Sequence, residues 1–339
     1  MRRWTKIGAI VILGIGMVLA AAITFTIGWR PIMGPRARPL TNRVFEKTPQ
    51  RMERGEYLAE NVLGCFECHG EHDWTQHAPP MLPGTKGAGY AQFPLEGLPG
   101  IVVPPNITPD PETGAGKWTD DQLARAIREG IGHDGRALFN LMPFQAFAHL
   151  SEEDLASVIV YLRSIPPVRK ALPKSQIIFP VKYLIRINPE PITAPVPPPD
   201  LSTPVSRGKY LVTVAGCSDC HTPQKNGQPI PGLEFAGGFE LKGPWGTVAS
   251  ANITPDASGI SYYDENLFVE TIRTGYLKGA RKLNQIMPWS KFRNMTDEDL
   301  KAIFAYLQTF QPVQHRVDNT EPPTPCKRCG FSHGLGDQN

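Results

Sequence analysis

The chain has 339 residues and a formal net charge of +3 at pH 7. Hydrophobic residues make up 41% of it and charged residues 20%, which excludes a largely disordered chain, and the length suits about two domains. The near-neutral charge gives no support for nucleic-acid binding. Proline is frequent, with 35 residues, and this predicts long irregular connections around compact modules.

An uncharged apolar run covers residues 7–29. A helix of this length reaches about 34 Å at about 1.5 Å per residue, which is enough to cross a bilayer core of about 30 Å. Arg2, Arg3 and Lys6 precede the run, so the positive-inside rule places the N-terminus in the cytoplasm and the rest of the chain on the opposite side. We therefore expect residues 1–29 to form a single-pass transmembrane anchor.

A cleaved signal peptide is the alternative interpretation of this segment. Ala20, Ala21 and Ala22 would supply a small-residue cleavage site, although the apolar run continues beyond them. Both interpretations export the remainder of the chain. Residues 1–51 carry a net charge of +8 and the remainder carries −5, so the basic excess lies in the anchor and in the linker, 30–51, that follows it.

The six cysteines form three C-x-x-C pairs, and two of these pairs are followed directly by histidine. The two complete motifs are Cys65, Cys68 and His69, and Cys217, Cys220 and His221. C-x-x-C-H is the attachment signature of c-type haem, because two thiols on one helical turn reach the two vinyl groups of one porphyrin and the histidine then faces the iron. The sequence therefore predicts two covalently bound haem c groups, with His69 and His221 as iron ligands.

An internal repeat contains both motifs. Residues 54–69 resemble 207–221, Asn-Ile-Thr-Pro-Asp occurs at 106–110 and again at 252–256, and 141–168 aligns without gaps to 286–313 with 10 of 28 positions identical. This predicts two haem modules, at 52–170 and 206–312. The segment between them, 171–205, contains nine prolines and is predicted to be a semi-rigid extended spacer.

Each module is predicted to be mostly helical, because no segment alternates well enough to demand a strand. Helices are expected near 54–64 and 207–216, leading into the haem motifs, and at 119–131, where Thr119 and Gln122 form a capping-box pattern. Amphipathic final helices are expected to begin at Ser151 and Thr296. The predicted fold class is all-α.

Methionine is the usual partner of histidine on the iron of cytochromes c. Of the eight methionines, Met142 and Met287 occupy equivalent positions in the repeats, and each precedes a proline. The alternative role for any methionine is core filling. We expect Met142 and Met287 to be the sixth ligands of the two irons, and we interpret the other histidines, His72, His77, His133 and His149, as solvated or structural.

Two pairs of arginines also occupy matched positions: Arg128 with Arg273, and Arg136 with Arg281. A guanidinium binds a carboxylate in a bidentate fork, so these side chains, Arg128 and Arg273 in particular, are candidates to hold the haem propionates. The alternative is a surface arginine on a helix. The matched tyrosines, Tyr57 with Tyr210 and Tyr161 with Tyr306, are expected to pack where the first and last helices of each module meet.

The third pair, Cys326 and Cys329, is followed by glycine and lies in the C-terminal tail, 313–339. A disulfide is the default for such a pair in an oxidising compartment. Two alternatives stay open: a zinc site completed by His333 and His315, and a haem held through the cysteines with a distant histidine.

The sequence resembles the membrane-anchored multihaem cytochrome c subunits of bacterial alcohol, aldehyde and sugar-acid dehydrogenases. The resemblance covers about 52–312. It is carried by the two C-x-x-C-H motifs, the two Asn-Ile-Thr-Pro-Asp segments, the run KWTDDQLARAIREG at 117–130 with DGRALF after it, and the two Met-Pro segments.

The resemblance implies two class I cytochrome c folds in tandem after the transmembrane helix, with His/Met ligation of each iron. It implies a location on the periplasmic side of the bacterial inner membrane. The implied function is electron transfer from a periplasmic or membrane-bound dehydrogenase towards quinone, other cytochromes or a terminal oxidase. Many such subunits carry three haems, whereas this sequence has two complete motifs, so we expect a two-haem carrier without substrate chemistry of its own.

A dihaem enzyme such as a cytochrome c peroxidase is the alternative function. It would need one iron with an open or displaceable distal position and an acid–base residue beside it, and the matched methionines argue against this. A redox sensor is a third possibility, but no signalling module is visible in the sequence.

Overall fold

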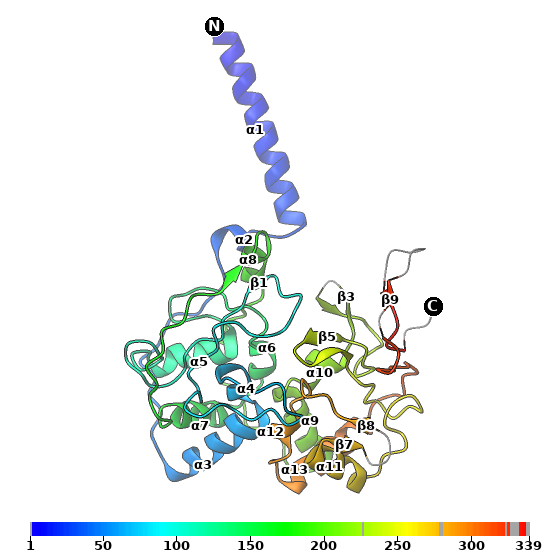
Figure 1. Cartoon of the computed structure of the whole chain (residues 1–339). Helices are drawn as coiled ribbons and strands as arrows, with labels where there is room; N and C mark the ends of the chain where they lie inside the picture. The colour runs from blue at the N-terminus through cyan, green and yellow to red at the C-terminus, as the bar shows by residue number, and fades with distance from the viewer. Residues whose placement is uncertain (1, 226, 278–280, 323, 326–331, 337–339) are drawn as a thin grey trace.

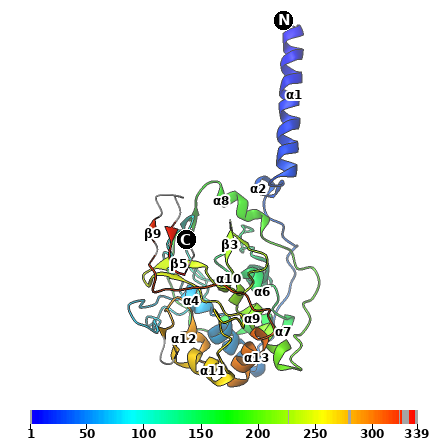
Figure 2. The same cartoon turned by 90° about the vertical axis from the view of Figure 1, so that its right-hand side faces the viewer.

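The computed structural model describes residues 2–225, 227–277, 281–322, 324–325 and 332–336. Helix α1 (Arg2–Phe25) stands clear of the body that the rest of the chain forms (Figures 1 and 2). Within it, Trp4–Phe25 is long and apolar enough to cross a membrane. The predicted apolar helix is therefore present, and it ends just before Gly28, whose φ of 69° is left-handed.

The body consists of two helical modules that lie side by side (Figure 1). The first contains α3 (Pro49–Tyr57), the π-helical turn η1 (Leu58–Val62), α4 (Cys65–His69), α5 (Asp120–Glu129), α6 (Phe144–Phe147) and α7 (Glu152–Leu162). The second contains α9 (Pro204–Val214), α10 (Cys217–His221), α11 (Glu265–Thr274), α12 (Trp289–Phe292) and α13 (Asp297–Leu307). The order of helices is the same in both modules, as the repeat predicts.

Short strands accompany the helices, so the prediction of a purely α-helical chain is too strict. Five antiparallel pairs occur in the described residues: β1 (Gly100–Ile101) with β2 (Gln176–Ile177), β3 (Gln224–Lys225) with β4 (Gln228–Pro229), β5 (Glu240–Gly243) with β6 (Gly246–Ala249), β7 (Tyr276–Leu277) with β8 (Arg281–Lys282), and β9 (Thr324–Pro325) with β10 (Ser332–His333). These pairs close loops of irregular sequence, where alternation is too brief to be recognised. The regular structure is nevertheless mostly helical.

The first and last helices of each module cross at close range, α3 against α7 and α9 against α13. Glycine makes this approach possible. A Cβ atom added to Gly55 would lie 2.0 Å from the carbonyl oxygen of Ser157, and one added to Gly208 would lie 1.9 Å from that of Ala302. Any side chain at either position would therefore separate the helices that carry the core.

Side-chain caps begin the helices where the sequence predicts them. Thr119 and Gln122 form the expected capping box, with the Thr119 hydroxyl accepting from the Gln122 amide and the Gln122 side chain accepting from the Thr119 amide. The hydroxyls of Ser151 and Thr296 accept from backbone amides three residues later. These local rules work because the cap and its partner are close in sequence.

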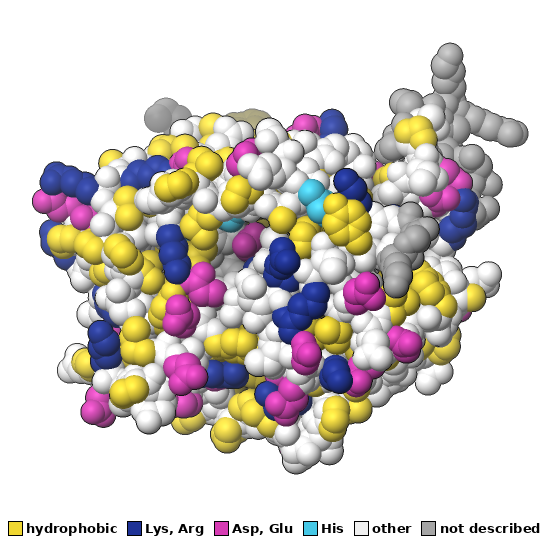
Figure 3. Space-filling view, turned by 60° about the horizontal axis from the view of Figure 1, so that its bottom comes forward, with side chains coloured by type: hydrophobic (Ala, Val, Ile, Leu, Met, Phe, Trp, Pro, Cys, Tyr) yellow, Lys and Arg dark blue, Asp and Glu magenta, His cyan; other side chains and the backbone are white. Residues whose placement is uncertain are grey.

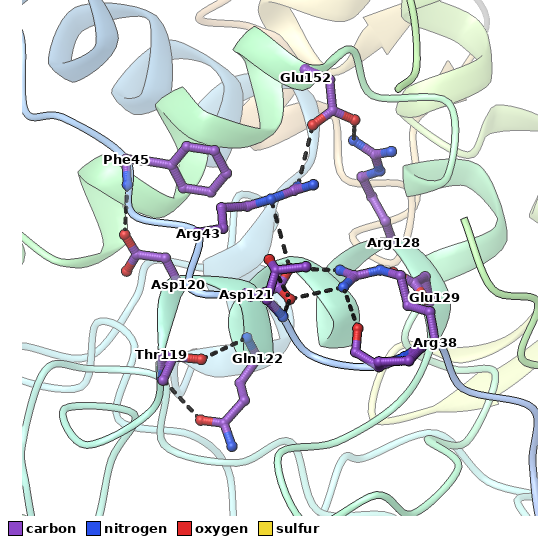
Figure 4. Close-up of polar contacts among 12 residues, drawn as sticks. Arg38, Arg43, Phe45, Thr119, Asp120, Asp121, Gln122, Arg128, Glu129 and Glu152 are labelled. Carbon is purple, nitrogen blue, oxygen red and sulfur yellow. Dashed lines mark hydrogen bonds and ion pairs between the residues drawn. The ribbon is translucent and has the colours of Figure 1, made fainter. Parts of the chain in front are cut away.

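The linker after α1 runs along the first module and is held to it by hydrogen bonds and ion pairs. Arg38 donates two hydrogen bonds to the Asp121 carboxylate, at 2.8 and 2.7 Å, and a third to Glu129 at 2.8 Å (Figure 4). Although burial alone would raise the pKa of Asp121, the hydrogen bonds from Arg38 lower it to about 2. Further along the linker, the Phe45 amide donates to the Asp120 carboxylate. These contacts fix the position of the linker on the first module.

The Pro-rich segment between the modules is less extended than predicted. It contributes strand β2, helix α8 (Val181–Leu184) and a 3-10 turn η2 (Ile185–Ile187). Arg186 donates to the carbonyl of Pro31, next to the end of α1, in α2 (Arg30–Met33). The segment therefore folds back against the first module and towards the membrane helix before it enters the second module (Figure 1).

Two tyrosines join the modules in a reciprocal way. The Tyr57 hydroxyl donates to the Asp299 carboxylate of the second module at 2.5 Å, and the Tyr210 hydroxyl donates to Asp154 of the first module at 2.5 Å. Arginine from the same module as each aspartate, Arg54 for Asp154 and Arg207 for Asp299, completes each cluster. Both rings pack against the hydrophobic core, and their hydroxyls in addition reach the other module, which the sequence did not indicate. They form an interface with approximate two-fold symmetry.

Replacing either tyrosine should loosen this interface. We expect Tyr57→Phe and Tyr210→Phe each to lower the free energy of unfolding by about 1.5–3 kcal/mol, because each removes a hydrogen bond to a charged acceptor and keeps the ring. Denaturant unfolding of the haem-loaded protein measures this. Tyr183→Phe, a ring on α8 outside the interface, is the control and should leave the transition midpoint unchanged. Equal midpoints for all three variants would contradict the assignment.

Candidate functional site

Both haem motifs form one-turn helices, α4 and α10, that begin at a left-handed glycine. Gly64 has φ 63° and Gly216 has φ 68°, a conformation that favours glycine. The sharp turn separates each motif from the helix before it and places its two cysteines on a single turn. None of Cys65, Cys68, Cys217 and Cys220 is in a disulfide.

The proximal histidines are oriented identically in the two modules. The Nδ1 of His69 lies 2.7 Å from the carbonyl oxygen of Pro105, and the Nδ1 of His221 lies 2.7 Å from that of Ala251. A hydrogen bond of this kind places the proton on Nδ1 and leaves Nε2 as the metal-binding atom. Burial lowers the pKa of both imidazoles, which favours the neutral form that a metal requires.

The Asn-Ile-Thr-Pro-Asp segments hold these carbonyl groups in place. In the second module, Asn252 directly follows Ala251, and its amide donates to the carbonyl of Val313 at 2.8 Å. Its side-chain oxygen accepts from the amide and hydroxyl of Thr254, at 2.9 and 2.8 Å. The segment is thereby tied to the residues after the last helix.

The first module repeats this arrangement with Asn106, which donates to the carbonyl of Val168 at 2.7 Å and accepts from Thr108 at 3.0 and 2.7 Å. The sequence indicated the motif by its exact recurrence, but its role in orienting the histidines depends on contacts about 30–60 residues away in the chain. We infer that these asparagines position the histidine acceptors and do not touch the haem iron themselves.

Removing one of these asparagines should weaken its module. We expect Asn252→Ala to lower the free energy of unfolding by about 2–4 kcal/mol, because it leaves buried donors and acceptors without partners. Asn294→Ala changes an exposed asparagine of the same module and should cost less than about 0.5 kcal/mol. Denaturant unfolding followed by haem absorbance compares the two. An equal loss in both variants would contradict the role given to Asn252.

The two candidate methionine ligands share the same local backbone. The Met142 amide donates to Phe139 at 3.1 Å and the Met287 amide donates to Asn284 at 3.1 Å. The prolines after them have φ and ψ of −81° and 52° in the first module and −78° and 47° in the second. Both methionines are partly buried and pack against the hydrophobic core, as Cys65 and Cys217 also do. Their equivalence supports the ligand prediction, which stays a prediction.

The matched arginines have protein carboxylates as partners. Arg128 donates to Glu152 at 2.7 Å and is buried (Figure 4), and Arg273 donates to Asp297 at 2.5 Å. Each therefore joins the end of one helix to the first turn of another. Arg136 pairs with Asp134 at 2.8 Å. Propionate binding by Arg128 and Arg273 stays a prediction, and their contacts favour a structural role.

The remaining histidines lie apart from one another. His72 is buried with its Nδ1 3.2 Å from the Gly70 carbonyl, His77 lies between the rings of Tyr276 and Trp289 at 5.0 Å from each, and His133 stacks on Trp118 at 4.3 Å. His149 is exposed. These positions agree with structural or solvated roles.

The third cysteine pair, Cys326 and Cys329, lies outside the described residues, so the disulfide, zinc and haem interpretations all stay predictions. His315, one of the proposed zinc ligands, is within the described part. Its Nδ1 lies 2.8 Å from the carbonyl oxygen of Ala236.

The donor set at each motif fits haem c. Each module presents two thiols on one turn, an adjacent imidazole whose Nε2 is free of protein hydrogen bonds in the described residues, and a Met-Pro turn whose methionine packs against the hydrophobic core. This is the arrangement of a c-type cytochrome, and it is present in both modules.

Comparison with known proteins supports this class. The cytochrome c family model matches residues 205–311, and the model described as cytochrome C oxidase, cbb3-type, subunit III matches residues 50–162. A dihaem cytochrome c-type protein of Cereibacter sphaeroides is 30% identical over 263 residues, which cover 74% of this chain and 83% of the relative. The chain belongs to the dihaem c-type cytochromes, and it carries two covalently bound haem c groups.

Two other relatives are subunits of larger enzymes. The cytochrome c subunit of the quinone alcohol dehydrogenase of Gluconacetobacter polyoxogenes is 28% identical, over 77% of this chain and 56% of the relative. The fructose dehydrogenase cytochrome subunit of Gluconobacter japonicus is 30% identical, over 81% of this chain and 55% of the relative. The chain thus spans about half the length of these two relatives.

Proposed function

We propose that the protein relays electrons from a dehydrogenase to the respiratory chain, by way of the quinone pool, another cytochrome or a terminal oxidase. The observation that supports this best is the duplication of one haem-attachment turn with its oriented histidine, in two modules that dock directly on each other. Within the described residues, neither module shows a site reserved for a substrate. The named relatives, cytochrome subunits of alcohol and fructose dehydrogenases, support a dehydrogenase as the electron donor.

Both modules are proposed to have the class I cytochrome c fold, arranged in tandem. Bound haem c supplies one-electron exchange between ferric and ferrous iron. The protein contributes thioether attachment through the cysteines and a neutral, oriented imidazole from His69 and His221. Under the same proposal, Met142 and Met287 occupy the sixth positions and exclude water and small substrates from the iron.

The electrostatic character of the surface agrees with a docking role that does not depend on one strongly charged patch. On the face turned away from α1, acidic and basic side chains are interspersed with apolar ones (Figure 3). The chain after residue 51 carries only −5 in total. We therefore expect partner binding to depend on shape and apolar contact, with a modest dependence on salt.

Reconstitution tests the proposed function. The purified protein, mixed with a membrane-bound dehydrogenase from its own source and that enzyme's substrate, should be reduced rapidly and then reoxidised by membranes. Alone, it should turn over neither alcohol nor peroxide. Peroxide turnover with a high-spin iron would favour the peroxidase alternative, for which none of the relatives named here gives support.

We also propose that α1 remains as an uncleaved anchor in the inner membrane, with both modules on the periplasmic side. Its length and composition and the basic residues before it support this. The mature protein should require detergent for extraction, and N-terminal sequencing should begin near Met1. A mature chain beginning near Ile23 would show that the segment is a cleaved signal peptide.

A further inference from the structure

Lys291, on α12 of the second module, reaches into the first module. Its ammonium nitrogen lies 3.4 Å from the carbonyl oxygen of Val62, at the end of η1, and the residue is only 8% exposed. The side chain passes directly over Gly64, since a Cβ atom there would lie 2.2 Å from the ammonium nitrogen. Gly64 is the residue before Cys65, so a cation from one module is buried beside the haem attachment turn of the other.

The surroundings give this cation no close counter-ion. Lys291 makes no ion pair with a carboxylate in the described part of the chain, and its one protein hydrogen bond there is long. Its ammonium nitrogen also lies 4.4 Å from the centroid of the Phe292 ring, which is a cation–π contact. The charged side chain of the first motif with which it interacts is Glu67. A buried cation without an ion pair is costly to maintain, which indicates that its field acts on something other than its own fold.

The repeat shows that this charge is present in only one module. The residue equivalent to Lys291 in the gap-free alignment is Ala146. The contact is also equivalent, because a Cβ atom on Gly216 would lie 3.8 Å from the Cβ of Ala146. The two attachment turns are therefore covered by matching short helices of the opposite module, but only the first turn receives a cation.

We propose that Lys291 sets the reduction potential of the first haem from across the module interface, raising the potential of the group attached at Cys65 and Cys68. Reduction adds one electron to the ferric iron and lowers the local positive charge by one, so a neighbouring cation favours the ferrous state. A cation in a low-dielectric interior acts more strongly than one in water. The proposal rests on the two haem groups and not on the identity of the electron donor.

Equilibrium redox titration of the full chain in detergent tests this, with Lys291→Met as the main variant. Burial lowers the pKa of Lys291, so the titration is repeated at a series of pH values, and the difference between the variant and the wild type should be largest at the lowest pH. At a fixed applied potential, the ferrous-to-ferric ratio of the first haem should fall by about tenfold in the variant, and that of the second haem should fall less. The effect should persist at high salt, because a buried charge is poorly screened.

Lys301→Met is the matched control, since it removes a partly exposed lysine of the same module that pairs with Glu265. It should leave both ratios unchanged. The shifted haem is assigned by repeating the comparison in a Cys217→Ala, Cys220→Ala background, which retains only the first haem. Equal shifts of both haems, or a shift no larger than that of Lys301→Met, would overturn the proposal.

Ala146→Lys provides an independent second variant, which adds the charge at the equivalent place. It should raise the potential of the second haem and leave that of the first nearly unchanged. No rise in this variant, in protein that retains both haems, would count against the proposal even if Lys291→Met failed to load. Because potentials are measured without a partner, this result is separate from the outcome of the reconstitution.

Discussion

Covalent haem should fall from two groups per chain to one when Cys65 and Cys68 are both replaced by alanine. The two thiols of one turn attach one porphyrin, and the structure places both on α4. Haem that survives acid–acetone extraction measures the stoichiometry, and Cys217→Ala with Cys220→Ala should give the same loss.

The tail cysteines supply the control for that experiment. Cys326→Ala with Cys329→Ala should leave the stoichiometry at two, because no histidine follows this pair directly. A wild-type value of three, falling to two in this variant, would show that the tail also carries haem and would contradict the prediction.

Met142→Ala and Met287→Ala should each convert one low-spin iron into a site with an open sixth position. Thioether ligation raises the reduction potential of haem, so each variant should lower the potential of one haem and reduce the Met–iron charge-transfer band by about half. Optical redox titration reports both quantities. Exogenous imidazole or cyanide should then bind one iron per chain in each variant.

Met81→Leu is the control for the methionine variants. Met81 has leucine opposite it in the second module, and its side chain lies near Gly70. The Met81→Leu variant should retain the full Met–iron charge-transfer band and the reduction potentials of both haems. If Met142→Ala and Met287→Ala also retain them, the two methionines fill the core and do not bind iron.

The tyrosine–aspartate bonds and Lys291, both at the interface, have different consequences. The tyrosine–aspartate bonds are the same in both directions, so they hold the modules together without distinguishing them. Lys291 is present in one direction only, so it gives otherwise similar modules different electrostatic surroundings. Under the proposal for Lys291, duplication of one module kept the tyrosine–aspartate bonds and placed the lysine on one side only. The two haems can then have different reduction potentials.

The sequence by itself determined the features that depend on neighbours close in the chain. The C-x-x-C-H spacing, the capping residues Thr119 and Ser151, the apolar run before residue 30 and the repeat all express local chemistry over a few residues, and the structure has each as a helix or cap. The repeat also predicted two equivalent modules, because two similar sequences obey the same local rules.

Only the tertiary structure decided which distant groups meet. Tyr57 and Tyr210 have the spacing of core residues, and nothing in that spacing shows that their hydroxyls cross to aspartates more than 50 residues away. Only the structure shows that Arg128 donates to Glu152, 24 residues further along the chain, while its binding of a haem propionate stays a prediction. Lys291 is indistinguishable in sequence from a solvated lysine on a helix. Its burial beside the first haem motif arises from the docking of two modules, and such docking depends on the fit of whole surfaces rather than on a short pattern.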